Sequence, residues 1–396
     1  MEYQRPQIKS LGKRLSEKRK YIQLIAGPRQ VGKTTLILQY IKSTNNLTYY
    51  VSADNQSSEG SVWIDKHWET VRLKLKTSKR KVYILIIDEI QKIPEWSEAV
   101  KKNWDEDTRN NINIKVVLLG SSQLLIQEGL SESLAGRFEY IHLGHWAFNE
   151  IRSAFKLTPE EFAWYGGYPG SMALIKDERR WKDYINYSII DATITKDILM
   201  LTQITKPVLL KNLFELGSLY SSQILSYNKI LGQFTDAGNT TTLAHYLKLL
   251  DASSLLSGIS KFTIKPHKKR SSSPKFQVYN TALISAQMSA SFNEIILDGN
   301  SWGRIVESTV GAHLLNNKLE KGYELFYWRE GNDEVDFILK KDSEVIALEV
   351  KSGIIKNRSG LNKFNKLFNP NKVIVIDNSG LSWKEFITID PDELFN

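Results

Sequence analysis

The sequence predicts an α/β protein that begins with a parallel sheet flanked by helices. Apolar strand-like runs alternate with helix-like stretches over residues 21–150, and a turn rich in glycine follows the first of these runs. The same rhythm returns after about residue 290, which predicts a second, smaller α/β unit. The strand candidates of the first unit are rich in Val, Ile, Leu and Tyr, as expected of strands buried on both faces: Tyr21–Ala26, Leu47–Val51, Val82–Ile87, Ile114–Leu119 and Tyr140–Leu143.

Length and composition narrow the class of protein. A chain of 396 residues predicts roughly two to three domains. Cysteine is absent, which excludes disulfides, thiolate zinc sites and cysteine nucleophiles. No apolar run approaches the roughly 18 residues that span a bilayer, and the opening residues MEYQRPQIKS lack the apolar segment of a secretory signal. We therefore expect a cytoplasmic protein.

The charge is basic and unevenly distributed. A formal net charge of +9 permits nucleic-acid binding without demanding it. The groups Lys13-Arg14 and Lys18-Arg19-Lys20 are expected on the solvated face of a leading helix. A further basic group consists of Lys265, Lys268, Lys269 and Arg270, and it lies between two strand candidates.

These two strand candidates, Gly258–Ile264 and Phe276–Tyr279, follow a largely helical region. Its best amphipathic helix is Thr240–Leu250, preceded by residues able to cap it. A helix followed by a hairpin with a basic tip resembles a winged helix, which is a DNA-binding arrangement. A solvated loop with no nucleic-acid role is an equally good interpretation of the tip.

The turn after the first strand has the pattern GxxxxGK[ST], which is the pattern of a phosphate-binding P-loop. Its glycines allow backbone N–H groups to surround phosphate oxygens at the positive end of the following helix. Lys33 is expected to reach the β- and γ-phosphates, and the Thr34 hydroxyl to ligate Mg²⁺. The predicted nucleotide-binding residues are Gly27, Pro28, Arg29, Gln30, Val31, Gly32, Lys33, Thr34, Thr35 and Asp88.

Asp88 and Glu89 come directly after the apolar strand Val82–Ile87. In a parallel sheet this position lies at the carboxyl edge, beside the phosphate loop. Asp88 is expected to help hold Mg²⁺, and Glu89 to polarise the attacking water as the catalytic base. Together with the loop, the two acids favour hydrolysis over simple nucleotide binding.

Two further side chains are catalytic candidates. Ser121 follows the strand Ile114–Leu119, where a hydroxyl could sense the γ-phosphate, with Ser122 as a second choice and a turn or helix cap as the alternative. Arg137 precedes the last strand of the unit and could stabilise transition-state charge, in its own chain or in a neighbouring subunit of a homo-oligomer. A surface salt bridge explains Arg137 equally well.

The segments GPRQVGKTT, ILIIDEIQKIPEW, LLGSSQLLI, LAGRFEYIHL and GGYPG occur in the order typical of one family. Over Tyr3 to about Ile355 the chain resembles the uncharacterised prokaryotic AAA-type ATPases close to the archaeal ATPase and STAND clades. The resemblance implies ATP as the nucleotide. It also implies a P-loop NTPase core (1–150), a helical lid (151–205), a winged helix (206–288) and a small α/β domain of restriction-endonuclease type (289–396).

The C-terminal unit contains a second group of candidate site residues. Two predicted antiparallel strands joined by a turn at Asp342-Ser343 place Asp336 opposite Glu349, and alternation places Lys351 on the same face. Glu307, in the helix Trp302–Leu315, could approach them. The pattern resembles PD-(D/E)xK nucleases, with Val335 in place of the proline. Asp336 and Glu349 would then hold Mg²⁺ near Lys351. A salt-bridged edge pair, or a degenerate nuclease fold kept for binding, is the alternative.

Three functional hypotheses follow from these patterns. In the first, a Mg²⁺-dependent ATPase uses its ATP or ADP state to control a DNA-directed C-terminal half. In the second, the chain is a STAND-like ATP switch that acts through protein contacts. In the third, it is an ATP-gated, metal-dependent nuclease. No membrane partner is expected.

Overall fold

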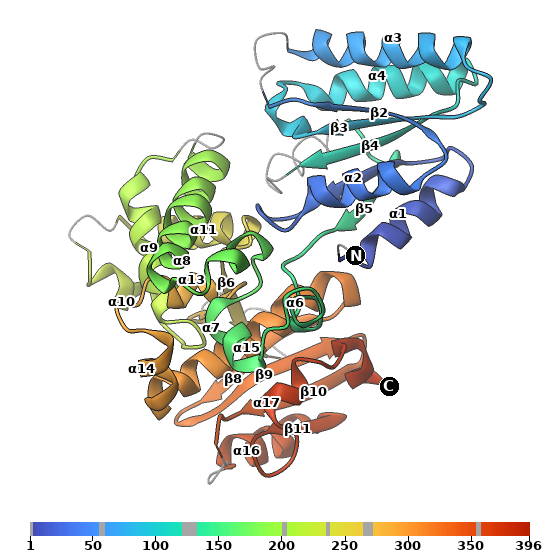
Figure 1. Ribbon diagram of the computed structural model, residues 1–396. Helices are drawn as coiled ribbons and strands as arrows, with labels where there is room; N and C mark the ends of the chain where they lie inside the picture. Colours follow the sequence, from blue (N-terminus) through green and yellow to red (C-terminus); the bar gives the residue numbers. More distant parts are fainter. Residues whose placement is uncertain are drawn as a thin grey trace. The chain divides into compact units, whose positions relative to one another are not determined.

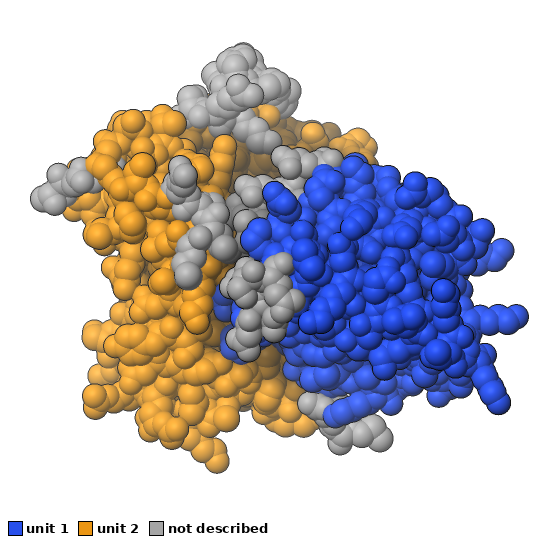
Figure 2. Space-filling view, turned by 90° about the horizontal axis from the view of Figure 1, so that it is seen from above, with its two compact units in different colours: residues 1–144 blue, residues 145–396 orange. Residues whose placement is uncertain are grey.

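The computed structural model describes residues 3–54, 60–120, 133–199, 204–234, 238–263, 272–353 and 358–396. The chain forms two compact units, residues 1–144 and 145–396, which Figure 2 colours blue and orange. The boundary falls six residues before the end of the predicted core at residue 150.

The first unit is built on a parallel five-stranded sheet with the order β2-β3-β4-β1-β5. The three inner strands are buried along their whole length, because apolar side chains fill both faces. The predicted α/β class and parallel sheet are thus confirmed. The strands are β1 (Ile22–Ala26), β2 (Leu47–Ser52), β3 (Tyr83–Asp88), β4 (Ile114–Gly120) and β5 (Phe138–His142).

Helices cover both faces of this sheet (Figure 1). The helices α3 (Ser61–Thr77) and α4 (Trp96–Arg109) pack on one face, where their apolar side chains join those of β1, β3 and β4 in one core. The helices α1 (Gln7–Ser16) and α2 (Lys33–Ser43) lie on the other face. A short 3-10 turn, η1 (Ile90–Lys92), follows β3.

The expectation that residues 18–20 belong to the leading helix was wrong. Helix α1 ends at Ser16. Beyond it, Arg19 donates to the carbonyl oxygens of Ile114 and Trp104, at 2.8 and 3.0 Å, and to Thr108 Oγ1 at 2.8 Å. Its guanidinium carbon also lies 3.5 Å from the centre of the Trp104 ring. A cation in this position stacks on an aromatic face and satisfies carbonyl groups, so Arg19 fastens the chain to α4 and β4.

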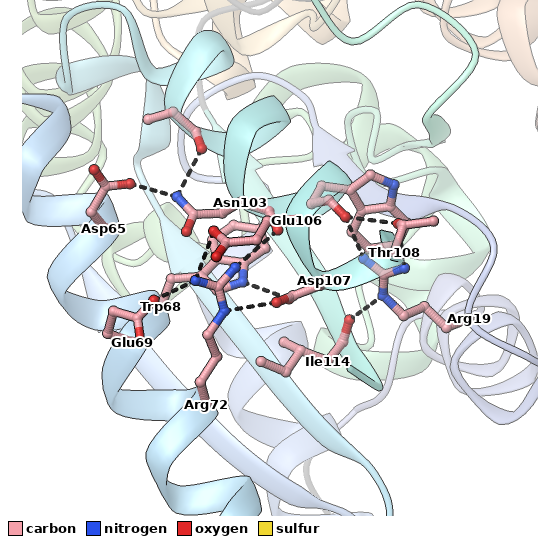
Figure 3. Close-up of polar contacts among 12 residues, drawn as sticks. Arg19, Asp65, Trp68, Glu69, Arg72, Asn103, Glu106, Asp107, Thr108 and Ile114 are labelled. Carbon is pink, nitrogen blue, oxygen red and sulfur yellow. Dashed lines mark hydrogen bonds and ion pairs between the residues drawn. The ribbon is translucent and has the colours of Figure 1, made fainter. Parts of the chain in front are cut away.

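A buried ionic cluster joins α3 to α4 (Figure 3). Asp107 is fully buried, and its two carboxylate oxygens accept from Arg72 Nε and Trp68 Nε1, each at 2.7 Å. Arg72 also pairs with Glu69 and with Glu106. Because each buried charge has a partner, the cluster can lie inside the helix pair without an uncompensated ion.

The second unit begins with short helices. They include two stretches with π-helical hydrogen bonding, labelled η3 and η4, which are uncommon conformations. The elements before its sheet are α6 (Phe148–Phe155), α7 (Pro159–Tyr165), η2 (Pro169–Leu174), α8 (Glu178–Asp183), η3 (Tyr184–Asp191), η4 (Ile194–Leu199), α9 (Pro207–Leu219), α10 (Tyr227–Leu231) and α11 (Thr240–Ala252).

A six-stranded sheet with the order β11-β10-β9-β8-β6-β7 holds the second unit together. Its strands are β6 (Leu256–Lys261), β7 (Lys275–Val278), β8 (Glu324–Glu330), β9 (Asp333–Lys341), β10 (Glu344–Val350) and β11 (Lys372–Ile376). The remaining helices are α13 (Ala282–Ser285), α14 (Phe292–Leu297), α15 (Gly299–Lys321), α16 (Ser359–Phe368), α17 (Trp383–Phe386) and the 3-10 turn η5 (Pro391–Phe395).

The predicted boundary at residue 288 lies within this sheet. Strands β6 and β7 form the expected antiparallel hairpin, but β6 also pairs in parallel with β8, Ser260 with Phe326 and Lys261 with Tyr327. The hairpin assigned to a winged helix is therefore continuous with the strands assigned to a nuclease-like domain. The three predicted segments after residue 150 share one compact unit.

The Gly166-Gly167 pair serves packing in the second unit. A Cβ on Gly166 would lie 1.9 Å from Asn280 Oδ1, and one on Gly167 would lie 2.4 Å from the Trp146 carbonyl oxygen. The backbone of Gly166 also has φ +69°, which favours glycine. The freed space lets Asn280 Oδ1 accept from the Gly167 N–H.

Within the parts of the chain that the structure describes, no helix is both long enough and apolar enough to cross a membrane.

Asp107→Ala should destabilise the first unit by about 3 kcal/mol, because Arg72 and Trp68 would each lose a buried partner. Asp105→Ala is the matched control on the same helix, since this acid is partly exposed and pairs with a partly exposed arginine. Its loss should be below about 1 kcal/mol. Chemical denaturation of both variants measures the difference, and equal losses would contradict the structural role given to Asp107.

Candidate nucleotide-binding site

The loop between β1 and α2 has the backbone that phosphate binding requires. Gly27 approaches the end of β5 so closely that a Cβ would lie 2.0 Å from the Leu143 carbonyl oxygen. Gln30 and Gly32 have φ of +60° and +89°, and α2 begins immediately afterwards at Lys33. These left-handed residues turn the chain sharply into the helix N-terminus, where backbone N–H groups are available to an anion.

Lys33 lies inside this loop. Its ammonium donates to the carbonyl oxygens of Gly27 and Pro28, at 2.9 and 2.8 Å, and the residue is buried. Backbone carbonyls therefore hold the cation within the loop itself. Of the other predicted loop residues, Pro28 and Val31 are buried, whereas Gln30, Thr34 and Thr35 are exposed.

Thr34 and Asp88 are brought together from two elements. Thr34 Oγ1 donates to Asp88 Oδ2 at 2.8 Å, and the other carboxylate oxygen, Oδ1, accepts from the Glu89 N–H at 2.9 Å. A hydroxyl next to a carboxylate offers the oxygen ligands that Mg²⁺ prefers. The residues present therefore fit a magnesium ion held with a nucleotide.

Tyr50 is a member of this site that sequence reasoning missed. Its hydroxyl, at the end of β2, donates to the same Asp88 Oδ2 at 2.8 Å. Burial and the neighbouring Asp88 raise the pKa of Tyr50 well above its ordinary value, so the phenol stays protonated and remains a donor. Asp88 is thus fixed by three donors. The motif could not reveal Tyr50, because the contact depends on the pairing of β2 with β3.

Glu89, the predicted catalytic base, directly follows β3. Its φ of +54° is left-handed, which is unusual for a residue other than glycine. Glu89 Oε2 accepts from Gln91 Nε2 at 2.6 Å. A strained backbone and an orienting amide fix this carboxylate next to Asp88.

Arg137 lies in an ion pair within its own unit. Its Nε and Nη2 atoms contact the two carboxylate oxygens of Asp105 at 2.8 and 2.9 Å. Its catalytic role stays a prediction, and acting on a phosphate would require Arg137 to leave Asp105.

Ser121 and Ser122 lie outside the described residues. The same holds for the basic tip at Lys265, Lys268, Lys269 and Arg270.

The second group of predicted residues lies where β9, β10 and α15 meet. Lys341 pairs with Glu344 and Phe337 with Leu348, which is the predicted hairpin register. Asp336 Oδ2 accepts from the Val350 N–H at 2.8 Å. A register shift between β8 and β9 falls beside this segment, and such irregularities often re-aim side chains near functional sites.

The carboxylates of this group act on one another. Burial first, and then the charge of Asp336, raise the pKa of Glu349 to about 8 and that of Glu307 to about 7. Lys351 Nζ lies 3.9 Å from Glu349 Oε1. Within the described residues, no three His, Cys, Asp or Glu side chains come close enough together to hold a metal ion.

Lys275, the first residue of β7, also belongs to this group. It is fully buried, and its Nζ lies 2.7 Å from Glu307 Oε1. In the sequence, only its position just before an apolar strand distinguishes Lys275. That position is equally typical of the end of a solvated loop, so the sequence did not predict its burial.

Comparison with known proteins agrees with the loop geometry. Residues 19–152 match the family model described as an AAA domain. Residues 158–294 and 302–387 match two models described as domains of unknown function, DUF8612 and DUF4143. Residues 19–152 are therefore similar to AAA domains, and the two regions that follow match models without a described function.

Two similar proteins carry the description "uncharacterized protein". One from Haemophilus influenzae is 23% identical over 354 residues, covering 85% of this chain and 84% of that protein. One from Methanocaldococcus jannaschii is 25% identical over 403 residues, covering 94% and 85%. Among solved structures, the Aeropyrum pernix ORC1 protein in complex with DNA is 12% identical, with a TM-score of 0.31, covering 74% of this chain and 92% of that one.

Tyr50→Phe should raise the Mg²⁺ concentration needed for half-maximal binding of labelled ATP by about tenfold, because a hydrogen bond to an ionised group contributes about 1.5 kcal/mol. Tyr49→Phe is the matched control, since its hydroxyl contacts His67 Nδ1 instead. Fluorescence titration at several Mg²⁺ concentrations checks the prediction. An identical Mg²⁺ requirement in the two variants would contradict the role of Tyr50.

Proposed function

We propose that this chain is a magnesium-dependent ATPase whose AAA-type domain binds ATP in the loop of residues 27–34. The observation that carries the proposal is the hydrogen bond between Thr34 and Asp88 beside a buried Lys33. A phosphate-binding cation, a hydroxyl and a carboxylate thus meet at one edge of the sheet, which is the arrangement that nucleotide hydrolysis needs.

Each residue has a separate task in this proposal. Lys33 exchanges its contacts with loop carbonyls for contacts with phosphate oxygens, and Thr34 and Asp88 hold Mg²⁺. Bound Mg²⁺ neutralises charge on the β- and γ-phosphates. Glu89, oriented by Gln91, takes the proton of the attacking water. Ser121 and Arg137 keep the roles expected from the sequence, γ-phosphate sensing and transition-state stabilisation.

Lys33→Ala should weaken ATP binding by about 100-fold, because it removes a contact between a cation and phosphate worth about 3 kcal/mol. Glu89→Gln should keep ATP binding and slow hydrolysis by about 10²- to 10⁴-fold, since only the base is lost. Titration with labelled ATP and phosphate release measure the two effects. Unchanged ATP affinity in the Lys33 variant would show that residues 27–34 are not the ATP-binding loop. ATP binding without turnover by the unaltered protein would favour the STAND-like switch.

The second candidate function concerns the C-terminal unit, where we propose metal-dependent cleavage of DNA. The supporting observation is geometric: Asp336 Oδ2 accepts from the N–H of Val350, the residue between Glu349 and Lys351, and Lys351 Nζ lies 3.9 Å from Glu349 Oε1. Two carboxylates hold the metal in this proposal, and the lysine stabilises charge on the scissile phosphate. ATP bound to the first unit would then control a DNA-directed second unit, with the basic tip as a further DNA contact.

Asp336→Ala and Lys351→Ala should each reduce Mg²⁺-dependent DNA cleavage by about 10²-fold or more, because each removes a charge that acts on the transition state. Lys363→Ala is the control, since this lysine has similar exposure and pairs with Glu330 and Asp333. Cleavage of a labelled duplex, with and without ATP, is the measurement. Cleavage that survives in both site variants would assign the activity elsewhere.

A further inference from the structure

Lys275 is a fully buried lysine at the start of β7. Burying an ammonium group is unfavourable unless charges and hydrogen bonds compensate it. Its environment also includes the ring of Phe337, whose centre lies 4.7 Å from Nζ. The ammonium group of Lys275 must therefore have partners inside the protein that compensate its charge.

The compensating groups come from two other elements. Lys275 Nζ lies 2.7 Å from Glu307 Oε1 on α15. On β9 it donates to the Asp336 carbonyl oxygen at 3.2 Å and lies 3.5 Å from Asp336 Oδ1. The Glu334 carboxylate is also near, at 3.8 Å. A single ammonium thus ties β7 to α15 and to β9.

The surroundings of Glu349, on β10, are different. Glu349 Oε2 is buried, and the structure gives it no hydrogen-bond donor among the residues it describes. Lys351, the lysine on this side, is half exposed and 3.9 Å from the other oxygen of Glu349. Glu307 and Asp336 therefore already have a cation, Lys275, inside the protein. Glu349 Oε2 remains as an acceptor atom for a cation bound from solution.

We propose that Lys275 is a built-in cation that occupies the Glu307 side of the group, so that only Asp336 and Glu349 remain for a divalent ion. Lys275 then pairs with Glu307 and Asp336 inside the protein, without reaching solvent. Glu307, expected from the sequence to approach the metal, instead serves as the partner of Lys275. The metal part of this inference rests on the second candidate function, whereas the ionic part does not.

A stability cycle tests the ionic part. Lys275→Met should lower the melting temperature by about 10 °C, because it leaves buried carboxylates without a partner. Lys275→Met with Glu307→Met replaces the pair by apolar side chains of similar size and should recover at least about half of that loss. Lys351→Met, on the half-exposed lysine, should change the melting temperature by less than about 2 °C. A double variant that melts no higher than Lys275→Met alone would overturn the proposal.

Titration with Mn²⁺ tests the metal part. All proteins carry Asp88→Asn, so that the loop site does not contribute, and no nucleotide is added. The parent should bind one ion, the Lys275→Met/Glu307→Met variant should bind it within about threefold of the same affinity, and Asp336→Asn should weaken it by about tenfold or more. Mn²⁺ binding that weakens by about tenfold or more in a folded Glu307→Gln variant, which keeps Lys275, would make Glu307 a ligand and overturn the proposal. A parent that binds no Mn²⁺ would remove the second candidate function, while the stability cycle would still decide the role of Lys275.

Discussion

The hydrogen bond between Thr34 and Asp88 depends on the order of the strands in the first unit. Thr34 lies in the helix that follows β1, and Asp88 is the last residue of β3; these strands are not neighbours, because β4 lies between them. Ala26 pairs with Gly120 across β1 and β4, and Ile87 pairs with Leu118 across β3 and β4. All three strands consequently end at one level, and the groups that follow them meet at the same edge. The phosphate loop, Lys33 and the acids Asp88 and Glu89 can act on one nucleotide only because this register aligns them.

The sequence predicted the elements whose signals are local. Buried parallel strands read as continuous apolar runs, and for this reason all five strands of the first unit lie within two residues of their expected bounds. The phosphate loop is equally local, since its glycines and Lys33 act within eight residues. The hairpin of β9 and β10 also followed from its own turn, which sets the register.

The features that the sequence did not predict depend on contacts between distant segments. Tyr50 resembles Tyr49 beside it, and only the pairing of β2 with β3 distinguishes them. Arg19 looked like part of a charged surface helix but satisfies carbonyl groups some 90 residues away in the chain. The parallel pairing of β6 with β8 joins residues more than 60 positions apart, and no local pattern indicates it. Local periodicity contains no information on which strand becomes the neighbour of another.

Two of the buried lysines, Lys33 and Lys275, show that the same side chain can have different roles. Lys33 donates to the carbonyl oxygens of Gly27 and Pro28, and these dipoles compensate its positive charge only partly. Phosphate oxygens are stronger partners for an ammonium group than carbonyls are, so this cation can exchange its contacts for those of a nucleotide. Lys275, in contrast, faces the carboxyl groups of Glu307 and Asp336, so a further anion would add little. Its charge is already neutralised, and its position is closed to solvent. The partners of each lysine, rather than its burial, therefore decide whether it binds a ligand or fixes the fold.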